Sequence, residues 1–168
     1  MTQRTQVANR IVSAMDDAAA TPMQWGVDDC ALWVANILQP VVGYDPAAAV
    51  RGRYRSRRGS MRITGREGLI GQLRSMAKRR KWKRIDPALA QSGDVGLAWT
   101  LLDGKAVLAT MICRDRDWFV GRSERGFSAI PAGRIAIVVN LAGRIAVRSW
   151  SAREPVQITR WSCGRADR

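Results

Sequence analysis

Cys30 is the residue of this sequence whose type and position most suggest chemistry. In the stretch "QWGVDDCALWV" it follows Asp28 and Asp29, where an apolar run with helical spacing begins. A thiol just inside a helix N-terminus is stabilised as thiolate, because the backbone amides point toward it. The two carboxylates act in the opposite direction, since a nearby negative charge disfavours a second one. The stretch therefore places a nucleophile well without clearly activating it.

The proton acceptor that such a thiol normally uses is missing, because the chain contains no histidine. Lys105 is a substitute only if burial lowers its pKa, and its "DGK" turn predicts exposure. Asp94 could accept a proton in principle. We expect Cys30 to be an inactive nucleophile position that packs as a small apolar residue, with weak activity as the alternative.

Neither a metal centre nor a disulfide framework is predicted. The three cysteines, Cys30, Cys113 and Cys163, lie at long, unequal spacings, and zinc sites normally need four ligands from cysteine or histidine. Cys113 lies in the apolar run "VLATMIC" and is expected to be buried, and no cofactor motif is present.

Length and composition predict one domain over residues 1–168. The chain is 46% hydrophobic and 25% charged, which suits a single compact core. Its apolar runs are too short for a membrane span, and its first residues lack the apolar block of a secretion signal. We therefore expect it to fold in the cytoplasm of the cell that makes it.

The net charge of +14 is concentrated in residues 51–84. This basic segment has fourteen Lys or Arg residues and one acid, Glu67, so the rest of the chain is nearly neutral. Such a segment can bind nucleic acid, an acidic protein surface or anionic lipid. The alternative is a solvated face that keeps the protein soluble.

The first half of the chain reads as helical. Two helices are expected from apolar periodicity, the second capped by Asp28 or Asp29 and ended by Pro40. A short third helix is expected within "YDPAAAVRGRY", with Asp45 as its cap and Pro46 at its first position. A polar loop "RSRRGS" follows, and then a helix opened by a Thr64/Glu67 capping box. The expected inward residues are Val7, Ile11, Val12 and Met15; Trp33, Val34, Ile37 and Leu38; and Leu69, Leu73 and Met76.

Strands are expected over residues 94–161, after Pro87. Short segments rich in β-branched and aromatic residues alternate there with turn signals at Asp103-Gly104, Arg116-Asp117 and Ala142-Gly143. Helices followed by antiparallel strands define an α+β domain. The predicted strands are "DVGLAW", "AVLATMIC", "DWFV", "RIAIVV", "RIAVRSW" and "VQITRW".

Three short motifs in order carry a resemblance to a known superfamily. "WGVDDCALWVA" followed by "SGDVGLAW" resembles the NlpC-type, papain-like cell-wall peptidases. With "GYDPAAAVRGRY" between them, the motifs are still more similar to a family encoded in phage and prophage tail-gene clusters. The matching residues are Trp25-Gly26 with Asp29-Cys30, Gly43 to Ala47 with Arg51 to Tyr54, and Gly93 to Val95.

The resemblance implies a papain-like fold with Cys30 at the start of its central helix, followed by an antiparallel sheet. It implies that Asp94 holds backbone amides at a strand start, and that the base belongs at Ala109, or less favourably Ala106, where histidine is absent. The remaining motif residues are candidates for binding: Trp25, Gly26, Asp29, Arg51, Arg53 and Tyr54. Two roles stay open for the arginines: they bind carboxylates or phosphates of a ligand, or they form ion pairs within the protein.

Together these features predict a tail-tip or tail-assembly protein that uses a degenerate peptidase fold for binding. Expected partners are other tail or hub proteins, and peptidoglycan peptide is a further possible ligand. Binding of nucleic acid through residues 51–84 is not favoured. It would be made in the host bacterial cytoplasm and assembled into the virion tail. The alternative is an active cysteine peptidase or amidase on peptidoglycan peptides, with Cys30 as nucleophile and a non-histidine or partner-supplied base.

Overall fold

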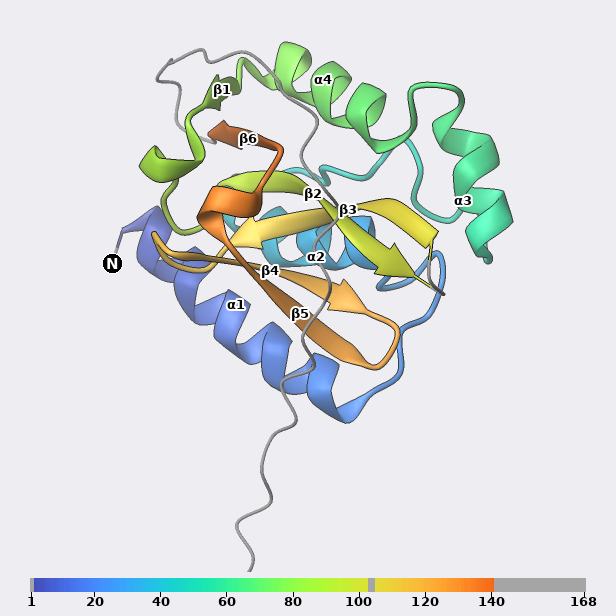
Figure 1. The fold of residues 1–168 in the computed structure, drawn as a ribbon, viewed down its shortest axis with the longest axis horizontal. Helices are drawn as coiled ribbons and strands as arrows, with labels where there is room; N and C mark the ends of the chain where they lie inside the picture. Colours follow the sequence, from blue (N-terminus) through green and yellow to red (C-terminus); the bar gives the residue numbers. More distant parts are fainter. Residues whose placement is uncertain (1, 103–104, 141–168) are drawn as a thin grey trace, which may run out of the picture.

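A computed structural model describes residues 2–102 and 105–140, which form a mixed α+β fold (Figure 1). Helices come first in the chain and an antiparallel sheet follows, which confirms the predicted α+β class. The helices are α1 (Gln3–Ala20), α2 (Cys30–Val42), α3 (Arg57–Thr64) and α4 (Gly68–Arg80). The strands are β1 (Lys83–Ile85), β2 (Val95–Leu102), β3 (Lys105–Cys113), β4 (Trp118–Ser123), β5 (Gly126–Pro131) and β6 (Ile137–Asn140).

The six strands described form one sheet in the order β1-β6-β2-β3-β4-β5, and every neighbouring pair is antiparallel. The longest ladder joins β2 to β3, from Val95 opposite Ile112 to Leu102 opposite Lys105. The sequence missed β1 and β5. Asp103-Gly104, the turn at 142–143, the predicted strands "RIAVRSW" and "VQITRW", and Cys163 lie outside the described residues.

Helix α1 buries Val7 and Ile11, whereas Val12 is 54% exposed. The prediction for Val12 was wrong because residues five apart do not share a face of an α-helix, unlike those three or four apart. Met15 is half-buried. The helix is capped by Thr2, whose hydroxyl accepts a hydrogen bond from the Thr5 amide.

Helix α2 begins where expected and ends later than expected. Asp29 is its N-cap, and the four predicted inward residues of this helix are buried. The helix continues past Pro40 to Val42, so the predicted stop was wrong. The helix is closed by Gly43, which has a φ of 75° and donates its amide to the Gln39 carbonyl.

The predictions between residues 45 and 67 were the least accurate. Residues 46–52 form turns in place of a helix, because the Asp45 carboxylate binds both the Ala47 amide and Arg51. The expected loop "RSRRGS" instead starts α3, since Ser56 caps that helix by accepting from the Gly59 amide.

The Thr64/Glu67 capping box was also wrong. The Thr64 hydroxyl donates back to the Ser60 carbonyl at the end of α3, and Glu67 makes no side-chain cap at the start of α4. In α4, Leu73 is buried and Leu69 and Met76 are half-buried, as the apolar spacing indicated.

The sheet separates two apolar clusters. One face packs against α1, α2 and α4 through residues such as Leu97, Ile112 and Val120. The other face holds a second cluster around Met111 and Phe119, which includes Ala132 of the 3₁₀ turn η2 (Ala132–Arg134) and the neighbouring Ile135. Among the described helices, none is long and apolar enough to cross a membrane.

Candidate functional site

Asp29 joins two of the sequence motifs in space. This carboxylate is 2% exposed and accepts hydrogen bonds from the Gly26 amide (2.8 Å) and the Tyr54 hydroxyl (2.7 Å). It also accepts from the amides of Ala31 (3.3 Å) and Leu32 (3.4 Å) at the start of α2. A buried carboxylate needs several donors, and here all of them come from the chain itself. Asp29 therefore positions α2 and Tyr54 and is not directed toward a ligand.

Gly26 is required by the same contact between the motifs. Its φ is +80°, and a Cβ there would overlap with the Tyr54 carbonyl oxygen. Trp25, its neighbour, is half-buried and lines a cavity beside Cys30. The "WG" pair therefore provides a tight turn and an aromatic wall.

Arg51, Arg53 and Tyr54 do not converge on a common ligand position. The Arg51 guanidinium binds the Asp45 carboxylate through two hydrogen bonds, from Nε (2.6 Å) and Nη2 (3.1 Å), and so lowers the pKa of Asp45. Burial and the hydrogen bond to Asp29 raise the pKa of Tyr54. Arg53 is exposed and donates to the Ala49 carbonyl (2.9 Å). This geometry favours the internal ion-pair role that the sequence left open for Arg51.

Arg122 is a functional-site residue that the sequence analysis missed. Its side chain is fully enclosed in β4 and donates to the carbonyls of Ala18 (2.7 Å), Thr21 (2.7 Å) and Gly126 (2.9 Å). It also pairs with the Asp28 carboxylate (3.0 Å). An arginine inside the apolar strand "WFVGRS" was the available signal, because a buried arginine must find acceptors. Arg122 thus fixes the segment that leads into α2.

Cys30 lies at the start of α2 and faces the cavity, but its thiol is not activated. Burial, with a smaller contribution from the Asp29 charge, raises the pKa of the Cys30 thiol to about 11, although a hydrogen bond with the Thr110 backbone acts to lower it. Asp28, which the sequence analysis counted as a second unfavourable charge, is paired with Arg122. Desolvation therefore raises the thiol pKa by more than the helix N-terminus lowers it, and Cys30 is a neutral thiol near pH 7.

Ala109, the position that the resemblance assigns to the missing base, lies on β3. It is next to Thr110, whose backbone forms a hydrogen bond with the Cys30 thiol. Alternation along β3 places Leu108 and Thr110 toward α2, whereas Ala109 packs with Ala98 and Met111 on the other face of the sheet. Ala106 shares the face of Leu108 by this alternation and is exposed. Ala109 and Ala106 both line the cavity, and neither side chain can accept a proton.

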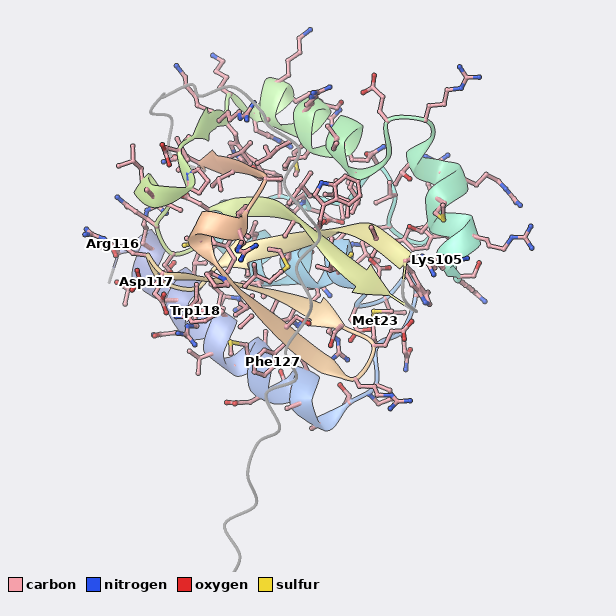
Figure 2. All side chains as sticks on the ribbon, in the orientation of Figure 1. Met23, Lys105, Arg116, Asp117, Trp118 and Phe127 are labelled. Carbon is pink, nitrogen blue, oxygen red and sulfur yellow. The ribbon has the colours of Figure 1, made fainter. Side chains whose placement is uncertain are left out.

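The two candidate substitute bases are not brought to the thiol. Lys105 is exposed at the start of β3 (Figure 2). Asp94 is fully buried at the other end of the β2–β3 ladder, where it binds Arg4 (3.0 Å) and accepts from the Gln91 amide (2.9 Å). It thus holds a backbone amide before β2, as the resemblance implied for this residue, and does not line the cavity beside Cys30.

The cavity beside Cys30 has a volume of about 430 Å³. It opens where β3 and β4 separate, because their pairing covers Ile112↔Val120 and Cys113↔Phe119 and does not continue toward Lys105. Helix α3 forms a further wall through its residues 57, 60, 61 and 64. The cavity is the concave feature that contains the motif cysteine.

Basic side chains cover the outer surface of α3, α4 and the segments beside them. Figure 2 shows long side chains projecting from both helices, away from the sheet. We call this the basic surface; its exposed cations are Arg53, Arg55, Arg58, Arg62, Arg66, Arg74, Lys78, Arg79, Arg80, Lys81 and Arg84. Arg80 also lies 3.6 Å from the centre of the Tyr44 ring. The three cations in the last turn of α4 additionally complement its helix dipole.

Cys113 shows how burial acts on a thiol that has no helix N-terminus. It is fully buried in β3, as predicted, and burial together with Asp94 and Asp115 raises its pKa to about 12. Its Sγ donates to the Asp115 carbonyl (2.8 Å). Cys113 is therefore the internal reference for Cys30 in a reactivity experiment.

Native Cys30 should react slowly with iodoacetamide at pH 8. Its pKa of about 11, against an ordinary value of 9.0, lowers the thiolate fraction about a hundredfold. Because folding raises the pKa of this thiol, the contribution of Cys30 to the free energy of unfolding is fully present below pH 9. It is lost as the pH rises from 9 to about 11. The measurement is peptide mapping by mass spectrometry of native and denatured chain, with Cys113 as the control. Equal rates for Cys30 in the two states would contradict the structure.

Residues 2–138 match the family described as a domain of unknown function, DUF6950. The match covers most of the chain, and the protein therefore belongs to this family. No curated protein and no solved structure matches the chain.

Proposed function

We propose that this chain is a tail-tip or tail-assembly protein of a phage or prophage, in which a papain-like, NlpC-type fold serves as a non-catalytic binding module. The order of its motifs supports the tail assignment by resemblance. The α+β architecture, with Cys30 opening α2 and an antiparallel sheet following, is compatible with the papain-like comparison.

The state of Cys30 carries the proposal that the module does not cleave bonds. Its thiol has a pKa of about 11, and the chain supplies no imidazole to accept its proton. The neighbouring carboxylate, Asp29, accepts four hydrogen bonds and raises the thiol pKa. Losing the general base of a nucleophile costs several orders of magnitude in rate.

The basic surface is the proposed docking face for neighbouring tail or hub proteins. It carries the exposed cations of a segment with fourteen basic residues and one acid. Complementary charge speeds encounter and sets orientation between proteins. Nucleic acid is the runner-up partner, because phosphates would use the same cations.

The proposal is tested with purified particles and purified chain on murein. We expect the chain to copurify with tails, and tails carrying Cys30→Ala to release the same amount of soluble peptide from murein sacculi as wild-type tails. Cys30→Ser is the matched variant, since it keeps the size of the side chain. Cleavage by wild-type tails that both variants lose would overturn the non-catalytic assignment and favour a peptidase whose base comes from a partner. Absence of the chain from purified tails would overturn the tail assignment.

A further inference from the structure

We propose that the open edge of β3, beside Cys30, binds an extended segment of a partner protein, which adds to the sheet as a further strand. The segment is uncharged and carries β-branched or other apolar side chains. This inference deepens the proposed function, because it names the kind of partner segment that the binding module takes. It rests on the chain acting as a binding module and not on the tail assignment.

The main chain of β3 bonds alternately toward its two neighbours, β2 and β4. The Cys113 amide donates to the carbonyl of Asp94, which directly precedes β2 (2.8 Å). The next amide, that of Arg114, donates to the Trp118 carbonyl of β4 (2.9 Å). Successive residues of a strand direct their N–H and C=O groups to opposite sides. The even-numbered residues of β3 therefore direct these groups toward β4.

The edge of β3 that faces β4 is paired at one end. The ladder between the two strands includes Ile112 opposite Val120 and does not reach Thr110. The Thr110 carbonyl does face β4, since a Cβ added to Gly121 would lie 2.8 Å from its oxygen. The Thr110 backbone also forms a hydrogen bond with the Cys30 thiol. Cys30 thus marks the point where strand pairing stops.

Leu108 and Ala106 continue this edge beyond Cys30. In the part of the chain that the structure describes, no strand pairs with them on the side away from β2. Both residues line the cavity of about 430 Å³, and each directs an N–H and a C=O toward it. The cavity is therefore bordered by an open strand edge as well as by side chains.

Another main chain matches the spacing of these groups. Leu108 and Ala106 lie about 7 Å apart along β3, which is the two-residue repeat of an antiparallel strand. An extended segment carries N–H and C=O groups at the same repeat, so it can bind both residues at once. Main-chain groups that lose water without finding a partner cost free energy, and an added strand supplies those partners. An apolar chain or ring supplies none.

The walls on both sides of the open edge are apolar. An added strand would direct alternate side chains to the two faces of the sheet. On the helix side they would meet Trp99 of β2 and Leu69 of α4. On the other face they would meet Val107, Ala109 and Met111 of β3. Strands that are buried on both faces are nearly continuous apolar runs, so the segment is apolar on both faces.

The charges around the cavity favour an uncharged segment. Among the described residues, three arginines and three acids line it: Arg57, Arg66, Arg122, Asp29, Glu67 and Glu124. Asp29 and Arg122 already have partners within the protein. The lining therefore carries no excess charge of either sign, and a charged side chain would lose its water without a selected partner.

Hydrogen exchange of the full chain, followed residue by residue by NMR, tests the proposal. Without a partner, the amides of Ala106 and Leu108 should exchange faster than those of Val107 and Ala109, which bond to β2. The peptide acetyl-Val-Thr-Val-Thr-Val-amide is the probe, because it is neutral and its residues favour strands. At saturation it should slow exchange at Ala106 and Leu108 at least about tenfold, the ratio that about 1.4 kcal/mol produces.

The outer edge of β5 provides the matched control, because its main chain is also open. Trp118 bonds toward β3, so by alternation Gly121 bonds with Ser128, and Ala129 faces away from β4. Ala106→Pro removes the N–H that faces the cavity and should weaken binding of the probe at least about tenfold. Ala129→Pro makes the same change at another exposed alanine and should leave binding unchanged. Circular dichroism checks folding, and exchange in the unsubstituted chain decides the question if a proline variant does not fold.

A peptide with the same side chains and every backbone amide N-methylated separates main-chain pairing from side-chain contact. It should bind at least about tenfold more weakly in isothermal titration calorimetry. Equal binding of the two peptides, unchanged exchange at Ala106 and Leu108, or slowed exchange at Ala129 in their place would overturn the proposal. Slow exchange at Ala106 and Leu108 without peptide would also overturn it, because the edge would already be paired, within the chain or with a second copy. Cleavage of murein, or absence of the chain from tails, would leave binding of the probe unchanged, so the two proposals fail separately.

Discussion

Replacing Arg122 with methionine is expected to lower the free energy of unfolding by about 3–5 kcal/mol. The substitution removes a fully enclosed guanidinium, and it leaves the Asp28 carboxylate, which is 25% exposed, with the Gln24 amide (2.6 Å) but without its charged partner at 3.0 Å. It also leaves the carbonyls of Ala18, Thr21 and Gly126 without their donor. The hydrogen bonds to the Ala18 and Gly126 carbonyls are buried, so these acceptors cannot return to water, and the loss exceeds that of an ordinary hydrogen bond. Urea unfolding, followed by circular dichroism, measures it.

Arg114→Met is the matched control for Arg122→Met. Arg114 forms an ion pair with Asp115 at 2.6 Å, but the side chains are 38% and 43% exposed. Exposed ion pairs contribute at most about 1 kcal/mol, because water and salt screen them. Similar losses for the two variants would show that Arg122 is not the buried connection between α1, β4 and the segment before α2.

Gly26→Ala is the second substitution with a large expected effect on the site. A left-handed backbone costs a residue with a Cβ about 1–2 kcal/mol. The added Cβ would also overlap with the Tyr54 carbonyl oxygen, so the contact between the two motifs must open, at a further cost of about 1–3 kcal/mol. Unfolding in urea gives the sum of the two effects.

Gly43→Ala isolates the backbone contribution to this result. Gly43 has a similar φ of 75°, and a Cβ at this position meets nothing within 4 Å. Gly43→Ala should therefore lower the free energy of unfolding by the backbone cost alone, about 1–2 kcal/mol. If Gly26→Ala were no more destabilising than Gly43→Ala, the close approach of Gly26 to Tyr54 would be refuted.

The parts of the candidate site that could be predicted from the sequence are those fixed by near neighbours. Asp29 caps α2 because it directly precedes the helix, and its amide donors at 31 and 32 follow within three residues. The burial of Cys113 followed from its apolar run. In contrast, the Tyr54 hydroxyl reaches Asp29 across 25 positions in the chain, and no local pattern indicated that contact.

Local patterns failed where side chains had a choice of partners. Asp45 was expected to cap a helix, but its pairing with Arg51 holds residues 46–52 in turns. Ser56 and Gly59 looked like a loop because both are common in loops, yet the serine hydroxyl and the glycine amide form a helix cap. Such competition is decided by which arrangement also packs against the rest of the fold.

The order of helices before strands, the position of Cys30 at the start of a helix, the positive charge of residues 51–84 and the lack of an imidazole could all be predicted without the structure. Those properties follow from composition and from periodicity over a few residues. The enclosure of Arg122 depends on long-range packing, since its acceptors at Ala18 and Thr21 lie about a hundred positions away in the chain. The neutral state of the Cys30 thiol depends on packing too, because its pKa is set by the water that folding removes and the charges that folding brings near.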